Sequence, residues 1–234
     1  MIFSIHQPCY FPWLGLLYKI ASSEVLIILD DVQLSDSAFQ HRNQFLTIDG
    51  NVKYLTIPFV KQNYINTPFK ELKIANNEWS HKHNNFLVNN YKKHPFFDQI
   101  YPEIQPLFMN KTSYLIDIVM ESMRMSIKLF GLSTKIIMQS QTSYDRSAKK
   151  ADLVIELLRA TNAKSYLSGK GAVSYQDEGS FALNGIALCY AEFEHPTYVQ
   201  KNSTEFVPGL SSLDFLFNVG SNQATEALNL RRCQ

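Results

Sequence analysis

The chain has 234 residues, of which 45% are hydrophobic and 18% charged, which is enough for one large domain or two small ones with a sizeable core. Its formal net charge of +1 gives no overall field to attract nucleic acid or an anionic membrane, so we expect neither partner. The sequence has no signal peptide, no apolar stretch of the roughly 20 residues that a membrane helix needs, and three cysteines without a zinc or disulfide pattern, which predicts a cytoplasmic protein with reduced thiols.

The first 31 residues predict a β–α–β unit. Residues 1–5 should form a short buried strand, after which Pro8 and Pro12 hold an extended loop. Apolar spacing predicts a helix over residues 13–21. The continuous apolar run at 25–29 is typical of a strand that is covered on both faces of a parallel sheet.

The rest of the chain alternates in the same way and predicts one α/β domain over residues 1–234. We expect a mostly parallel sheet flanked by helices, with a helical insertion at roughly 79–131. The order of strand, loop, helix and strand resembles that of nucleotidylyltransferase or Rossmann-like folds. The further predicted elements are strands at 54–58, 69–74, 135–138, 166–171 and 186–190, and helices at 114–130, 147–160, 181–184 and 212–218.

The loop at residues 6–15 is the first candidate site, because ligands of open α/β sheets bind beyond the carboxyl ends of the strands. His6 can act as acid, base or hydrogen-bond donor, and Gln7 offers both amide functions. Tyr10 and Trp13 present flat faces with a polar group, although each aromatic taken singly is more typical of core packing.

Two further features suit a phosphate. Gly15 would let a ligand approach the backbone, and Lys19 lies about one helical turn further on. The segment Ser168-Gly169-Lys170-Gly171 ends a predicted strand, and its backbone N–H groups together with Lys170 could hold an anion.

Polar pairs elsewhere have two interpretations each. Asp30 and Asp31 end a predicted strand and could orient an amine, accept its proton or hold a metal, or could simply cap a turn. Arg42 with Asn43 could grip a pyrophosphate or form an ordinary surface pair. Cys9 could act as a nucleophile, but a small apolar residue is the preferred interpretation.

Residues 5–15 (Ile-His-Gln-Pro-Cys-Tyr-Phe-Pro-Trp-Leu-Gly), with Lys19-Ile20 and Leu29-Asp30-Asp31-Val32-Gln33, resemble the opening signature of the WbqC-like family. Cys9 stands where asparagine is expected in that pattern, which implies altered specificity if the asparagine binds substrate. The resemblance covers nearly the whole chain. It continues at His41-Arg42-Asn43, Leu55-Thr56-Ile57-Pro58, Trp79 with Lys82-His83, Tyr166-Leu167-Ser168-Gly169, Tyr175, Tyr198 with Gln200, Phe206-Val207-Pro208, Leu210-Ser211 and Asp214.

The resemblance implies a role in bacterial O-antigen or other surface-polysaccharide synthesis. The expected reaction is transfer or ligation of an acyl group, glycine in particular, to the amine of a nucleotide-linked amino sugar, with an acyl or amino-acid donor as second partner. The expected catalytic residues are His6, Lys170 and Asp31, and no metal ligand is assigned. The expected substrate-binding residues are Gln7, Tyr10, Trp13, Gly15, Lys19, Asp30, Gln33, Arg42, Asn43, Ser168, Gly169, Tyr175, Tyr198 and Gln200.

The activation of the donor stays open at this point. ATP with magnesium is a candidate cofactor because of the resemblance to nucleotidylyl-transfer folds, but Trp13-Leu14-Gly15 stands where their His-x-Gly-His type of motif would continue. A thioester donor would need no ATP. The alternatives are an acetyl-coenzyme A-dependent N-acyltransferase and a non-catalytic sugar-nucleotide-binding assembly protein.

Overall fold

The computed structural model describes residues 1–35 and 39–228, without the side chains of Ser174 and Tyr175. The last six residues of the chain, with their two arginines and the third cysteine, therefore lie outside the described part, as does Asp36.

A five-stranded sheet lies at the centre of the fold, and all its neighbouring strands are parallel. The strand order is β5-β2-β1-β6-β7, which places β1 in the middle. The chain builds outwards from β1 first on one side and then on the other, so the order reverses between β1 and β6. This confirms the predicted α/β class, and it creates the switch point at which doubly wound sheets bind ligands. The strands are β1 (Ile2–His6), β2 (Val25–Ile28), β5 (Lys135–Met138), β6 (Ser165–Ser168) and β7 (Ala187–Tyr190).

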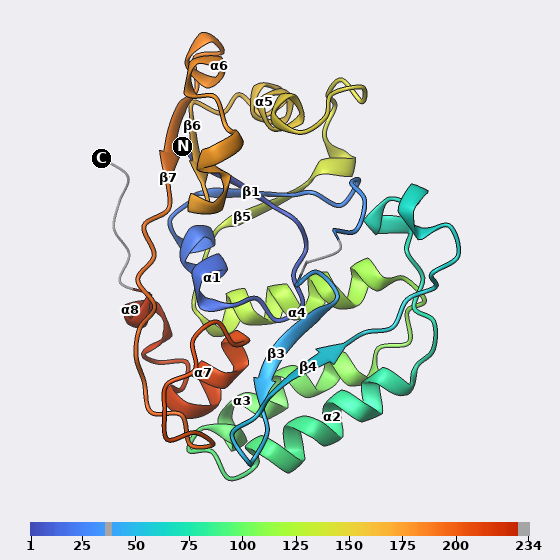
Figure 1. Cartoon of the computed structure of the whole chain (residues 1–234), viewed down its shortest axis with the longest axis vertical. Coiled ribbons are helices and arrows are strands. Elements are labelled where there is room, and N and C mark those ends of the chain that lie inside the picture. Colours follow the sequence, from blue (N-terminus) through green and yellow to red (C-terminus); the bar gives the residue numbers. More distant parts are fainter. Residues whose placement is uncertain (36–38, 229–234) are drawn as a thin grey trace.

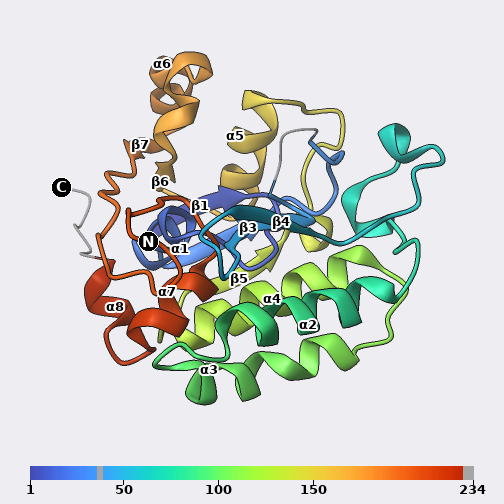
Figure 2. The same ribbon diagram turned by 60° about the horizontal axis from the view of Figure 1, so that its bottom comes forward.

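Helices cover both faces of this sheet (Figures 1 and 2). Successive side chains of a strand point to opposite faces, so each strand serves two cores. Phe3 and Ile5 of β1 pack in the core that includes α5 (Ala151–Ala160) and Phe181 of the short helix α6 (Glu178–Leu183). The alternate residues of β2, such as Leu26, pack in the second core. That larger core contains α1 (Leu14–Ala21), α4 (Leu115–Leu129) and α7 (Ser212–Val219).

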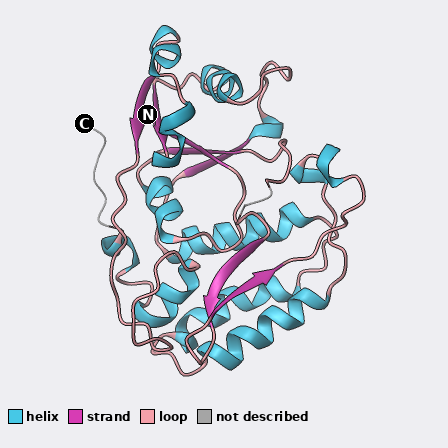
Figure 3. Ribbon diagram, viewed as in Figure 1, coloured by secondary structure: helices cyan, strands magenta, loops and turns pink. Residues whose placement is uncertain are grey.

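The middle of the chain forms a helical layer with a β-hairpin on it (Figure 3). Helices α2 (Glu78–Tyr91), α3 (Phe97–Ile104) and α4 correspond to the predicted helical insertion. The antiparallel hairpin of β3 (Arg42–Leu46) and β4 (Val52–Thr56) contacts α2 through the rings of Phe45 and Phe86, whose centroids are 6.1 Å apart. The remaining elements are α8 (Ala224–Ala227) and the short 3-10 helices η1 (Tyr64–Asn66), η2 (Phe69–Glu71), η3 (Gln105–Met109), η4 (Gln139–Gln141) and η5 (Lys170–Tyr175).

Two local predictions were wrong. Residues 69–74 do not form a strand: they begin with η2, whose first two amides donate to the carbonyl groups of Val32 and Asp30 rather than to a ladder. Strand β3 was missed because its first three residues are polar. Its pairing with β4 rather than an apolar pattern defines it.

The loop between β1 and α1 has a constrained backbone. Phe11 has a φ of 40°, in the left-handed region that non-glycine residues rarely adopt. The amide of Asn43 donates to the carbonyl oxygens of Tyr10 and Phe11 at 3.1 and 2.6 Å. The Ser211 hydroxyl also donates to the Phe11 carbonyl at 3.1 Å, and the Ser122 hydroxyl accepts from the Phe11 amide at 3.1 Å. Three segments distant in sequence thus hold this strained residue in place.

We expect Asn43→Ala to lower the free energy of unfolding by about 1–3 kcal/mol, because the buried Tyr10 carbonyl loses the Asn43 donor and the Phe11 carbonyl keeps only the Ser211 hydroxyl. Urea denaturation measures the change. Asn89→Ala, an exposed position on α2, is the matched control and should stay within about 0.5 kcal/mol of the wild type. Equal, small effects in both variants would show that Asn43 does not hold the loop.

Candidate functional site

A cavity of about 310 Å³ lies at the carboxyl ends of β1 and β6, at the switch point of the sheet. We call it the lysine cavity. Strands β1 and β6 end there, helix α1 begins there, and the glycine segment follows β6. The cavity therefore collects residues that are far apart in the sequence. The predicted site residues that line it are His6, Trp13, Gly15, Lys19, Gly169 and Lys170, joined by Leu16, Gly171, Ala191 and Phe193.

Lys19 is a buried cation without a carboxylate partner in the described part of the chain. Its side chain is 7% exposed, and its ammonium donates to the carbonyl oxygen of Ile5 at 2.8 Å. Burial lowers its pKa from 10.5 to about 8, so it stays largely protonated at neutral pH. A buried positive charge that faces a cavity and has no counter-ion attracts an anionic ligand.

His6 is a neutral hydrogen-bond acceptor at the same cavity. Its Nδ1 lies 2.7 Å from the Gln7 carbonyl oxygen, which can only accept, so the ring proton belongs on Nδ1. Burial, and to a smaller extent the nearby Lys19 charge, lower the pKa of His6 to about 4, while the bond to Gln7 opposes the shift. Nε2 therefore carries a lone pair at neutral pH, and it makes no hydrogen bond to a described residue.

The glycines of the lysine cavity have two different roles. A Cβ on Gly169 or Gly171 would meet nothing within 4 Å, so this segment leaves its backbone open to a ligand. A Cβ on Gly15 would instead approach the Phe193 ring to 3.0 Å and the Trp13 Nε1 to 3.1 Å. Gly15 therefore allows two aromatic rings to close over α1, which differs from the predicted contact between ligand and backbone.

A second cavity, of about 210 Å³, shares a wall with the first. We call it the glutamine cavity. His6 and Trp13 line both cavities, and their ring centroids are 5.6 Å apart in an edge-on arrangement. The other lining residues are Gln7, Pro8, Cys9, Ser35, Phe39 and Gln40.

Cys9 lines the glutamine cavity but lacks the features of an activated nucleophile. It is 1% exposed, and burial raises the pKa of its thiol. A thiol is nucleophilic as the thiolate, so this environment favours the apolar interpretation of Cys9.

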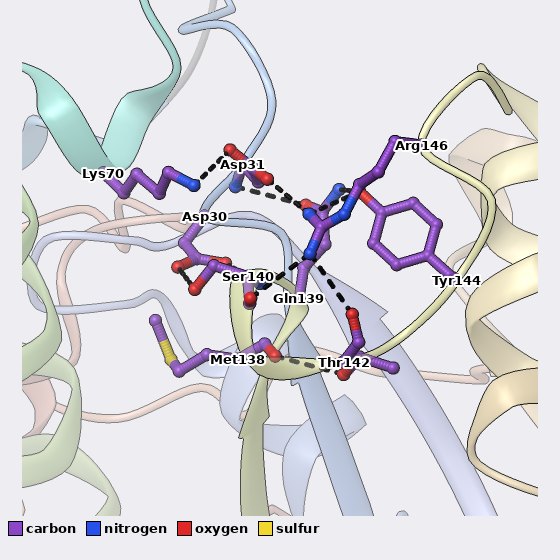
Figure 4. A network of polar contacts seen from close by, with 9 residues as sticks. All are labelled: Asp30, Asp31, Lys70, Met138, Gln139, Ser140, Thr142, Tyr144 and Arg146. Carbon is purple, nitrogen blue, oxygen red and sulfur yellow. Dashed lines mark hydrogen bonds and ion pairs between the residues drawn. The ribbon is translucent and has the colours of Figure 1, made fainter.

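Asp30 and Asp31 lie on the same edge of the sheet but line neither cavity. Figure 4 shows Asp31 between Lys70, at 2.7 Å, and Arg146, at 2.5 Å. The Asp30 carboxylate accepts from the backbone amide of Ser140 at 2.9 Å and from its hydroxyl at 2.5 Å. Both carboxylates thus join the segments that follow β2 and β5, and the structure does not bring the predicted catalytic Asp31 to His6.

Several other predicted binding residues serve the fold. The Tyr10 hydroxyl lies 3.0 Å from Nδ1 of His83 in the core. Asn43 holds the strained loop, and the Arg42 guanidinium lies 4.8 Å from the centre of the Tyr54 ring.

Four more of the predicted residues, Gln33, Ser168, Tyr198 and Gln200, also lie away from the walls of the two cavities. Tyr198 and Gln200 donate to the buried Asp214 carboxylate at 2.8 and 3.0 Å, which attaches the segment after β7 to α7. Gln33 is exposed, and Ser168 is buried at the end of β6. The side chain of Tyr175 lies outside the described residues.

The sequence argument missed Phe193, Phe39 and Gln40. Phe193 follows β7, so the rule that ligands bind at strand ends would have included it. Gln40 and Phe39 lie in an irregular segment without a periodic pattern, and no sequence signal indicates their place in a cavity wall.

Two absences concern the described residues alone. No three His, Cys, Asp or Glu side chains among them gather closely enough to hold a metal ion. None of their helices combines the length and apolar character that crossing a bilayer requires.

We expect Asp31→Asn to lower the free energy of unfolding by about 1 kcal/mol, because both cations lose a partly exposed partner. The loss should shrink in 1 M NaCl, because the Debye length there is only about 3 Å and salt screens both ion pairs. Glu78→Gln, which breaks an exposed pair with Lys82, is the control and should change stability less. Abolished turnover in a variant of unchanged stability would instead make Asp31 catalytic.

The lowered pKa of Lys19 predicts a pH-dependent stability. Between pH 8 and 10.5 the unfolded chain binds more protons at Lys19 than the folded chain, so the wild type gains stability as pH rises through this range. Lys19→Met should lack that gain. Its stability relative to the wild type should therefore be greater at pH 7 than at pH 10.5 in urea denaturation. Lys164→Met, at an exposed position, should differ from the wild type in stability by the same amount at both pH values. If Lys19→Met also showed a pH-independent difference, the lowered pKa of Lys19 would be wrong.

Comparison with known proteins places the chain in a family. The model of the WbqC-like protein family matches residues 7–226. The uncharacterized protein Rv1507c of Mycobacterium tuberculosis is 26% identical over 219 residues, which are 93% of this chain and 94% of that protein. No solved structure gives a significant match. Because the family model matches residues 7–226, which is nearly the whole chain, the chain belongs to the WbqC-like protein family.

Proposed function

We propose that the protein is a transferase that binds a nucleotide-linked amino sugar through its phosphates and adds an acyl group, glycine foremost, to the sugar amine. The observation that carries the proposal is the buried ammonium of Lys19, which has no carboxylate partner among the described residues, at the switch point of a parallel sheet. This place is where doubly wound folds bind phosphorylated ligands.

The lysine cavity offers a complete set of phosphate contacts. The buried Lys19 and the exposed Lys170 both line the cavity, and each supplies a positive charge. The segment Gly169–Gly171 has an open backbone beside them. Among the described lining residues no carboxylate opposes these charges, so the site favours a diphosphate.

His6 has the position and protonation state to handle the proton of the reaction. As the sugar nitrogen attacks the acyl carbonyl, a C–N bond forms and the bond from the acyl carbon to its leaving group breaks. The nitrogen loses one proton. His6 Nε2 accepts it, and a weakly basic imidazole passes it readily to the departing group.

The place of this reaction in the cell is part of the same proposal. The resemblance of the N-terminal segment to the WbqC-like signature supports cytoplasmic synthesis of O-antigen or other surface-polysaccharide precursors. ATP could activate an amino-acid donor, and a thioester could deliver the acyl group without ATP. The phosphates of coenzyme A also suit the lysine cavity, so acetyl transfer from acetyl-coenzyme A is the second candidate.

Binding to matched lysine variants tests the anion site. Isothermal titration calorimetry would use UDP, dTDP and GDP, their amino sugars, ATP with magnesium, and acetyl-coenzyme A. For the nucleotide that binds the wild type, Lys19→Met should weaken affinity about 10- to 100-fold, since a charged hydrogen bond contributes roughly 1.5–3 kcal/mol. Lys170→Met should weaken it less, and Lys164→Met should leave it unchanged.

The catalytic role of His6 has a separate readout. With glycine and ATP as the donor system, mass spectrometry of the sugar nucleotide should show a mass gain of one glycyl group. His6→Gln should reduce turnover about 10²- to 10⁴-fold while nucleotide affinity stays within a few-fold. Acetylation by acetyl-coenzyme A alone would select the second candidate. Tight nucleotide binding without turnover would indicate the non-catalytic assembly protein.

A further inference from the structure

We propose that the glutamine cavity is the subsite for the uncharged sugar ring, and that Gln40 recognises an oxygen of that ring. This inference rests on the proposed function, because it assumes that the phosphates of the same molecule occupy the lysine cavity. His6 and Trp13 line both cavities, so the two cavities lie side by side. One ligand can therefore place its charged part on one side of His6 and its neutral part on the other.

The lining of the glutamine cavity suits a neutral ligand. Its described side chains come from glutamine, serine, cysteine, proline, aromatic residues and a histidine that is neutral above pH 4, so none carries a charge near neutral pH. This contrasts with the two lysines of the neighbouring cavity. A charged acyl phosphate would lose its hydration here without gaining a counter-ion, which costs far more than desolvating the hydroxyl groups of a sugar ring.

Gln40 is the residue that points to a ligand oxygen. It is 2% exposed, and its Oε1 accepts from the backbone amide of Ser35 at 2.9 Å. This bond fixes which end of the side-chain amide is the oxygen. Its Nε2 is then a buried donor without a partner among the described residues. Such a donor is costly to leave unsatisfied, and a hydroxyl or carbonyl oxygen in the adjoining cavity would satisfy it.

The aromatic side of the cavity completes the match to a sugar. Trp13 and Phe39 lie with ring centroids 5.3 Å apart and give the cavity an apolar side. Gln7 also lines the cavity, is half-buried and makes no hydrogen bond to a described residue through its side chain. A sugar ring has an apolar face of C–H groups and a rim of hydroxyls, so it suits both the apolar and the polar lining residues. In this pose its amine lies near His6.

The decisive experiment compares a nucleotide with its own sugar conjugate. Calorimetry would measure UDP and UDP-glucosamine, or the dTDP or GDP pair if the wild type prefers that base. We expect Gln40→Met to weaken the affinity for the amino-sugar nucleotide about five- to tenfold, the equivalent of one hydrogen bond. The affinity for the nucleotide alone should stay unchanged. Gln62→Met, an exposed glutamine, should alter neither affinity. Equal weakening of both ligands, or no effect on either, would overturn the subsite.

A second measurement separates recognition from a structural role. Gln40→Met also removes the acceptor of the Ser35 amide, so its melting temperature without ligand should fall slightly. Recognition is measured instead as the extra rise in melting temperature that the amino-sugar nucleotide gives over the nucleotide alone. Gln40→Met should lose this extra rise, and an equal rise in the variant and the wild type would refute the inference. If the wild type binds the nucleotide but gains nothing from the sugar, the subsite fails and the phosphate site stands. If no nucleotide binds, the proposed function fails first.

Discussion

The strained backbone of Phe11 is the constraint on which the site depends. A φ of 40° is unfavourable for a phenylalanine and persists because Asn43, Ser122 and Ser211 bond to its peptide groups. Those three side chains belong to the hairpin, to α4 and to the residue before α7. The packing of three distant elements thereby sets the path between β1 and α1, and with it the positions of His6 and Trp13 at opposite ends of the loop.

The positive charge of the lysine cavity remains because the nearby carboxylates are engaged in contacts that hold the fold together. Asp30 accepts from Ser140, which follows β5, and Asp31 pairs with Lys70 of η2. Asp214 accepts hydrogen bonds from two tyrosines and a glutamine. Lys19 retains no such partner among the described residues and bonds only to a backbone carbonyl. Carboxylates that stabilise the architecture cannot neutralise the lysine cavity, so its field stays positive.

The wall of His6 and Trp13 divides this charged cavity from an uncharged one. Burial keeps the imidazole neutral, and its bond to Gln7 directs the lone pair of Nε2 away from the backbone. A reaction between an anionic and a neutral partner, or between the two parts of one substrate, has its natural centre at this residue. The same burial keeps the Cys9 thiol protonated, which leaves proton transfer rather than thiolate attack as the available chemistry.

Sequence alone determined the parallel α/β sheet, because apolar runs such as residues 25–29 are set by local burial on two faces. It also predicted that His6 and Lys170 lie near each other: His6 ends β1, Lys170 follows β6, and parallel strands bring their carboxyl ends to one edge. Tertiary structure alone decided that Asp31 pairs with Arg146 across 115 positions and that Gln40 closes a cavity wall. The physical reason is that these contacts arise between irregular segments, whose paths depend on packing with distant elements rather than on a local periodicity.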